Sequence, residues 1–203
     1  MSNLIISIGR QFGSGGRELG KRLAELLGIA YYDNEIVSEI VKRSNLAEEY
    51  VNQILEKKII RYFPITVSHT LSSPDYSHFD VENRVYSAKI KVIKEMAEKG
   101  DCVIVGRCAD FVLAEKNPLR IFVYADMDKK IERCRLKNEE DSNLSDKALK
   151  QKIVKVDKGR ARYYEFFTGN RWGDKKNYDI CVNTSNLPIK LIAENLAHTI
   201  QKL

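Results

Sequence analysis

Residues 4–17 read LIISIGRQFGSGGR, an apolar run that passes directly into a loop containing four glycines. A stretch with the pattern of a helix, residues 18–27, follows at once. Glycine lets backbone amides turn toward an anion, and the start of a helix adds the positive end of its dipole. This order of strand, glycine loop and helix predicts a binding site for a phosphate group or a nucleotide.

The loop departs from the standard phosphate-binding pattern G-x-x-x-x-G-K-[ST]. Arg17 and Glu18 follow Gly16, so the lysine and the metal-binding hydroxyl are both missing. Arginine can bind phosphate oxygens through its planar fork, which makes Arg17 a candidate replacement. A glycine-rich turn without a ligand is the plain alternative. The glycine loop of a dehydrogenase is disfavoured for two reasons. Glu18 occupies the position of the last glycine in Gly-x-Gly-x-x-Gly, and no tyrosine is followed four residues later by the lysine of the Tyr-x-x-x-Lys pair of short-chain dehydrogenases.

The bulk properties set wide limits. The chain has 203 residues, a net charge of +6 and four cysteines, none of them in C-x-x-C spacing. We expect no zinc site, and we expect Cys102 and Cys181 to be small core residues. The positive charge suits an anionic small substrate. The chain has no basic run with interleaved aromatic residues, so nucleic-acid binding is not expected. With no signal peptide or membrane span recognised, a cytoplasmic location is expected.

Apolar runs alternate with amphipathic stretches along the whole chain. The predicted strands are 4–8, 29–33, 102–106, 120–125 and 179–184, and the predicted helices are 18–27, 34–43, 46–58, 81–99, 128–137, 145–167 and 187–203. Residues 63–79 are interpreted as a mobile loop because of their prolines, serines and histidines. This alternation predicts an α/β fold with a parallel sheet and right-handed crossovers.

Charged residues follow the ends of several predicted strands, where α/β sheets bind their ligands. Arg107 comes directly after the third strand, and Arg133, Arg160 and Arg162 lie on later helices. The three helical arginines could equally be solvated side chains paired with nearby acids. Asp33 follows the second strand, where it could accept hydrogen bonds from a ribose, orient an arginine, or cap the next helix.

Several segments together resemble the cytidylate kinase-like family, a branch of the nucleoside monophosphate kinases. They are residues 6–17, 31–33, 103–110 and 157–179. The resemblance implies a three-layer P-loop kinase fold with a five-stranded parallel sheet. It further implies that residues 1–203 form one domain, with an inserted helical substrate-binding segment at about 34–99 and a lid at about 136–160.

The resemblance also assigns site residues. ATP would be bound by Gly13, Ser14, Gly15, Gly16, Arg17 and Glu18, and the monophosphate by Asp33 and Arg107. Arg17, Arg133, Arg160 and Arg162 would neutralise charge on the transferred phosphoryl group. Glu18 could reach magnesium through water, although an acid in a first helical turn is also favourable by itself. Typical cytidylate kinases have a lysine where this chain has Gly16, and Cys108 replaces an aspartate.

The function expected from these observations is ATP- and Mg²⁺-dependent phosphoryl transfer to a nucleoside monophosphate, CMP or dCMP. Two alternatives stay open because the lysine and the hydroxyl are missing. One is a non-catalytic nucleotide-binding regulatory module, and the other is a kinase for a different small acceptor. The base and sugar preference and the oligomeric state are not predicted.

Overall fold

The fold is described from a computed structural model, for residues 3–44, 46–48, 51, 76–137 and 139–202. Five strands form one parallel sheet in the order β2-β3-β1-β4-β5. Their bounds are β1 Ile5–Arg10, β2 Ala30–Tyr32, β3 Cys102–Val105, β4 Leu119–Tyr124 and β5 Ile180–Asn183. The parallel α/β architecture expected from the alternating pattern is confirmed, and so is the five-stranded sheet that the resemblance implies.

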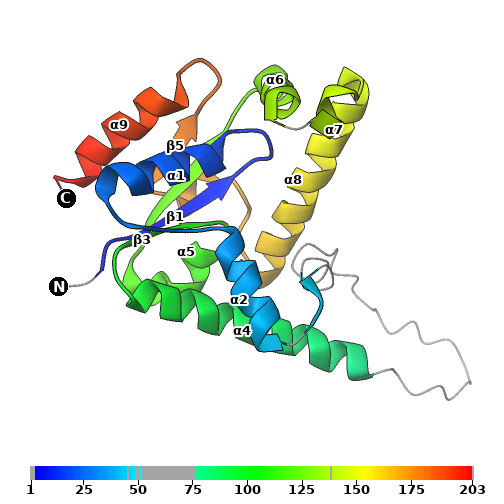
Figure 1. The fold of residues 1–203 in the computed structure, drawn as a ribbon, viewed down its shortest axis with the longest axis vertical. Helices are drawn as coiled ribbons and strands as arrows, with labels where there is room; N and C mark the ends of the chain where they lie inside the picture. The colour runs from blue at the N-terminus through cyan, green and yellow to red at the C-terminus, as the bar shows by residue number, and fades with distance from the viewer. Residues whose placement is uncertain (1–2, 45, 49–50, 52–75, 138, 203) are drawn as a thin grey trace, which may run out of the picture.

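Helices cover both faces of this sheet (Figure 1). Helices α1 (Gly16–Leu27) and α9 (Ile189–Ile200) lie on one face, and α2 (Asn34–Ser44) and α4 (Tyr76–Glu98) lie on the other. Successive strand residues point to opposite faces, so Ile5 packs with the second pair of helices and Ile6 with the first. Both faces of the inner strands are therefore apolar, which explains their continuous hydrophobic runs.

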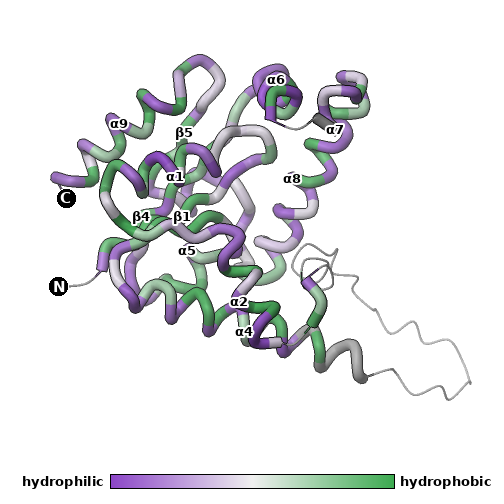
Figure 2. Tube along the Cα trace, in the orientation of Figure 1, coloured by the Kyte–Doolittle hydropathy of each residue, from purple (hydrophilic) through white to green (hydrophobic). Residues whose placement is uncertain are grey.

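The remaining helices lie toward the carboxyl ends of the strands or join the strands. They are α5 (Ala109–Val112), α6 (Met127–Lys137), α7 (Glu139–Ser142) and α8 (Asp146–Thr168), with short 3-10 turns η1 (Ala114–Lys116) and η2 (Lys175–Asn177). Ser145 caps α8 by accepting a hydrogen bond from the Ala148 amide at 3.3 Å, as its position predicted. Amphipathic α4 and α9 alternate between hydrophilic and hydrophobic residues (Figure 2).

Two expectations from the sequence are wrong in detail. Helix α4 begins at Tyr76, so residues 76–79 are helical rather than part of a loop. Cys181 is exposed, unlike buried Cys102, because β5 is an edge strand with an incompletely covered face. The predicted helix at 46–58 and the rest of the predicted loop lie mostly outside the described residues.

Candidate functional site

The glycine loop joins β1 to α1, as predicted. Gly13 and Gly15 have left-handed backbone angles, with φ of 73° and 81°. A Cβ on Gly15 would lie 2.3 Å from Ile189 Cδ1, and one on Gly13 would lie 2.9 Å from Cys134 Sγ. These glycines therefore allow the loop both to turn and to pack closely against α9 and α6.

The start of α1 offers free amides. No backbone hydrogen bond to another described residue is donated by Gly15, Gly16, Arg17 or Glu18. Gly15 caps the helix without a side-chain hydrogen bond. Unsatisfied amides at a helix start, next to left-handed glycines, favour an anion there.

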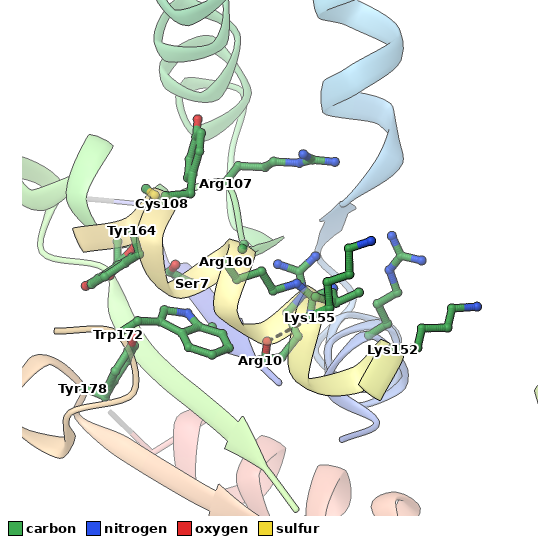
Figure 3. A pocket seen from close by; sticks show the side chains of 17 residues that line it. Ser7, Arg10, Arg107, Cys108, Lys152, Lys155, Arg160, Tyr164, Trp172 and Tyr178 are labelled. Carbon is green, nitrogen blue, oxygen red and sulfur yellow. Dashed lines mark hydrogen bonds between the residues drawn. The ribbon is translucent and has the colours of Figure 1, made fainter. Parts of the chain in front are cut away.

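A cavity of about 430 Å³ opens beside this loop, at the carboxyl ends of β1 and β3. Six cationic side chains line it: Arg10, Arg17, Arg107, Lys152, Lys155 and Arg160. Asp110, the one acid among the described lining residues, accepts a hydrogen bond from Tyr164 Oη at 2.6 Å. Figure 3 shows the basic side chains toward one side and Tyr164, Trp172 and Tyr178 toward the other. The cavity thus combines a strongly basic part with an aromatic part.

Asp33 lies at the edge of the basic part and is 4% exposed. Its carboxylate is 2.6 Å from Arg17 Nε and 3.6 Å from Arg10 Nη2. No amide of the first turn of α2 donates to it among the described residues, so the cap interpretation is not what the structure has. The structure shows Asp33 paired with arginines, and its role toward a ribose stays a prediction.

Arg10 lines the cavity with only 13% of its side chain exposed, and no pattern in the sequence selects it. Burial, followed by the nearby charge of Arg160, lowers the pKa of Arg10 to about 9, while Asp33 acts in the opposite direction. Arg160 Nη1 also donates to the Arg10 carbonyl oxygen at 3.1 Å. Closely spaced cations repel one another, so a bound anion would lower the electrostatic free energy of this cluster.

Arg107 follows β3 and has a positive φ of 58°, as does Cys108 with 56°. Such angles cost a residue other than glycine some free energy, and they concentrate at functional sites. Arg107 Nε is buried without a hydrogen-bond partner among the described residues. The side chain lines the cavity, as predicted from its place after an apolar strand.

Helix α8 contributes one face to the cavity. Its lining residues are Lys152, Lys155, Val156, Gly159, Arg160, Tyr163 and Tyr164, a spacing of three and four residues. Arg162 is exposed on a different side of α8 and does not line the cavity. The structure therefore brings Arg160 to the site but not Arg162.

The loop is also tied to α6 and α8. The Phe12 amide donates to Asp157 Oδ1 at 2.7 Å, and Lys130 Nζ lies 3.3 Å from Asp157 Oδ2. Lys130 Nζ also donates to Gln11 Oε1 at 3.1 Å. Both ionic groups are largely buried, so removing Asp157 would leave the Lys130 ammonium without a carboxylate, at a cost of about 3 kcal/mol or more.

Arg133 lies on the other side of the glycine loop. It donates to the hydroxyl and the carbonyl oxygen of Thr184, and the Thr184 hydroxyl donates to the Ser14 carbonyl oxygen at 2.7 Å. Ser14 is fully buried, and its own hydroxyl donates to the Gln11 carbonyl oxygen. Arg133 is thus close to the loop but does not line the cavity.

The described residues do not form a magnesium cage. Glu18 accepts hydrogen bonds from Lys137 Nζ at 2.7 Å and from Arg22 Nε at 3.1 Å. Although partial burial raises it, these two bonds bring the pKa of Glu18 below its ordinary value. No three His, Cys, Asp or Glu side chains in the described part of the chain are placed to hold a metal. In this arrangement the Glu18 carboxylate pairs with cationic side chains of the protein itself.

The aromatic part of the cavity is lined by residues of α8 and of the segment before β5. Trp172 and Tyr178 line it and pack on Phe122, with ring centroids 5.3 and 4.8 Å apart. Tyr163 accepts a hydrogen bond from Lys89 Nζ at 2.8 Å. Lys89 is 1% exposed, and burial lowers its pKa. The sequence could not predict that these side chains lie together, because they come from segments far apart in the chain.

Comparison with solved structures defines the class of fold. The chain is similar to an uncharacterized protein from Eubacterium ventriosum, with a TM-score of 0.70 and 26% identity over 98% of this chain and 99% of that one. It also resembles a shikimate kinase from Bacteroides thetaiotaomicron, with a TM-score of 0.56 and 15% identity over 98% and 97%. A shikimate kinase from Acinetobacter baumannii has a TM-score of 0.54 and 15% identity over 100% and 94%. The fold is that of the P-loop kinases.

The family follows from the sequence match. The model of the cytidylate kinase-like family matches residues 5–186, and the chain belongs to this family. No curated protein matches the chain. No helix in the described residues combines the length and apolar character needed to cross a membrane. Family and fold together support a nucleotide-binding kinase.

Proposed function

We propose that this protein transfers the γ-phosphoryl group of ATP to a nucleoside monophosphate, CMP or dCMP, giving the diphosphate. The observation that carries this proposal is the cavity beside the glycine loop, with six cations and an aromatic part. Phosphoryl transfer depends on positioning and charge neutralisation, which clustered guanidinium and ammonium groups supply. An aromatic wall suits a nucleobase, which stacks on such rings.

In this proposal each part of the site has a role. The loop residues Gly13 to Glu18 hold the ATP phosphates, chiefly through the free amides of residues 15–18. Arg107 binds the acceptor phosphate, and Asp33 holds Arg17 in position beside it. Arg133 and Arg160 add positive charge from α6 and α8.

Magnesium would accompany ATP and neutralise phosphate charge. Because the hydroxyl of the standard pattern is absent and Glu18 is bound to two cations, phosphate oxygens and water would supply its ligands. Residues 1–203 would act as one domain in the cytoplasm. The segment 34–99 would carry the acceptor side, and residues 136–160 would be the lid.

A different acceptor is the second candidate, because the P-loop kinases of similar fold include shikimate kinases. The test measures ADP release with Mg-ATP and CMP, dCMP, UMP, AMP, GMP or shikimate, against a reaction without acceptor. The proposal expects the largest kcat/KM with CMP or dCMP. Faster turnover with shikimate would assign a different acceptor. ATP binding without ADP release from any acceptor would support a regulatory module and contradict the proposal.

A further inference from the structure

The glycine loop has lost its lysine, but it also has an arginine at an unusual place. Gly15 caps α1 and corresponds to the last glycine of G-x-x-x-x-G-K-[ST]. Counting back five residues, the first glycine of the pattern falls on Arg10, and the lysine falls on Gly16. The chain therefore has a cation where the pattern has glycine, and a glycine where the pattern has the cation.

The two positions are in direct contact. A Cβ on Gly16 would lie 2.5 Å from Arg10 Cβ and 3.1 Å from Arg10 Cγ, so any side chain at position 16 would collide with the arginine stem. The guanidinium then crosses Gly106, where a Cβ would lie 1.7 Å from Arg10 Nη1. Glycines at 16 and 106 thus make room for one side chain that runs from the loop into the cavity.

The end of this side chain is available for a ligand. The Arg10 guanidinium donates no hydrogen bond to any described residue, and its nearest carboxylate, Asp33, is 3.6 Å away and closer to Arg17. Other cations near the loop are occupied, since Lys130 binds Asp157 and Gln11 and Arg133 binds Thr184. Figure 3 shows Arg10 and Arg160 beside each other, joined by the hydrogen bond from Arg160 to the Arg10 carbonyl oxygen.

We propose that Arg10 takes over the role of the missing loop lysine, so that the phosphate-binding cation has moved from the end of the loop to its beginning. The inference rests on the proposed function in one respect, which is that the anion in the loop is a nucleoside triphosphate. Burial and then the nearby charge of Arg160 lower the pKa of Arg10, although Asp33 raises it, so a bound anion would stabilise this guanidinium.

An exchange of the two residues tests this inference. Arg10→Gly should lower kcat about a hundredfold, as loss of one transition-state donor does elsewhere. Gly16→Lys by itself should not help, because its Cβ would meet the Arg10 stem. The double variant Arg10→Gly with Gly16→Lys removes the collision and restores the standard pattern. Its kcat should exceed that of Arg10→Gly at least tenfold.

A binding measurement keeps the test independent of turnover. Affinity for inorganic tripolyphosphate, measured by titration calorimetry, should fall at least tenfold in Arg10→Met, which keeps an apolar stem against Gly16. Gly106→Ala should produce a similar loss, because it displaces the guanidinium. Gly28→Ala is the matched control, since Gly28 also has a positive φ, 66°, but open space around it.

The outcomes separate the two proposals. If the wild type binds tripolyphosphate through Arg10 but phosphorylates none of the acceptors, the proposed function fails and the role of Arg10 stands. If Arg10→Met binds tripolyphosphate as the wild type does, the inference is overturned. The same holds if the folded double variant is no better than Arg10→Gly in both measurements. Circular dichroism of each variant checks folding, and Arg10→Met decides the matter if Arg10→Gly does not fold.

Discussion

Single residues in this site are held by partners that the sequence does not place beside them. Asp33 shows this, because its carboxylate fixes Arg17 at 2.6 Å while Arg10 lies 3.6 Å away. Arg107 is the opposite case, since its buried Nε has no partner among the described residues. A buried donor without a partner costs about 1–3 kcal/mol, which a bound anion would remove.

Arg107→Ala is therefore expected to weaken binding of the acceptor nucleotide more than binding of ATP. Steady-state ADP release should show the KM for CMP rising about ten- to a hundredfold, the value of one hydrogen bond to a charged group. The KM for ATP should change little. Arg171→Ala, which removes an exposed arginine outside the cavity lining, is the control. Equal effects on both substrates would count against Arg107 as an acceptor ligand.

At the scale of elements, the face of α8 decides which of its residues reach the site. Residues three and four apart share a face, and Lys152, Lys155 and Arg160 follow this spacing into the cavity. Arg162 has the same charge and lies two positions further on, yet it is exposed outside the cavity. The arginines of α8 should thus differ in function.

The pair Arg160→Ala and Arg162→Ala measures this difference. Loss of Arg160 should lower kcat about a hundredfold, as for other groups that stabilise developing charge. Loss of Arg162 should change kcat less than about fivefold, because an exposed charge contributes below about 1 kcal/mol. Each variant acts as the other's control for the helix. A larger loss in Arg162→Ala would mean that α8 presents another face during the reaction.

At the scale of the whole molecule, the net charge of +6 is concentrated in part around one cavity. The six cations of the lining come from the end of β1, α1, the segment after β3, and α8. Their mutual repulsion opposes folding, and a bound polyanion offsets it. Ligand binding should therefore stabilise the native state by mass action.

Thermal unfolding with ADP or tripolyphosphate checks this expectation. At a hundred times Kd, the ligand should add about 2.7 kcal/mol and raise Tm by roughly 5–10 °C for a chain of this size. Sodium chloride at equal ionic strength is the control for screening. An equal rise with chloride would indicate general screening rather than a site. Arg10→Met should show a smaller rise with tripolyphosphate than the wild type.

Much of the fold could be predicted because hydrophobic pattern is local information. The five strand positions and the cap at Ser145 follow from short stretches of sequence, and the structure confirms them within a few residues. The start of α4 and the exposure of Cys181 could not be read in this way. Both depend on what packs against the segment, which no local pattern states.

The same distinction between local sequence and tertiary packing applies to the site. The sequence by itself determined that a glycine loop precedes a helix and that Arg107 follows an apolar strand, because these are neighbours along the chain. Only the tertiary structure decided that Arg10 fills the space above Gly16, that Arg160 faces the cavity while Arg162 does not, and that Trp172 and Tyr178 line it. Those relations arise where distant segments meet, and close packing at such a meeting selects one arrangement of side chains.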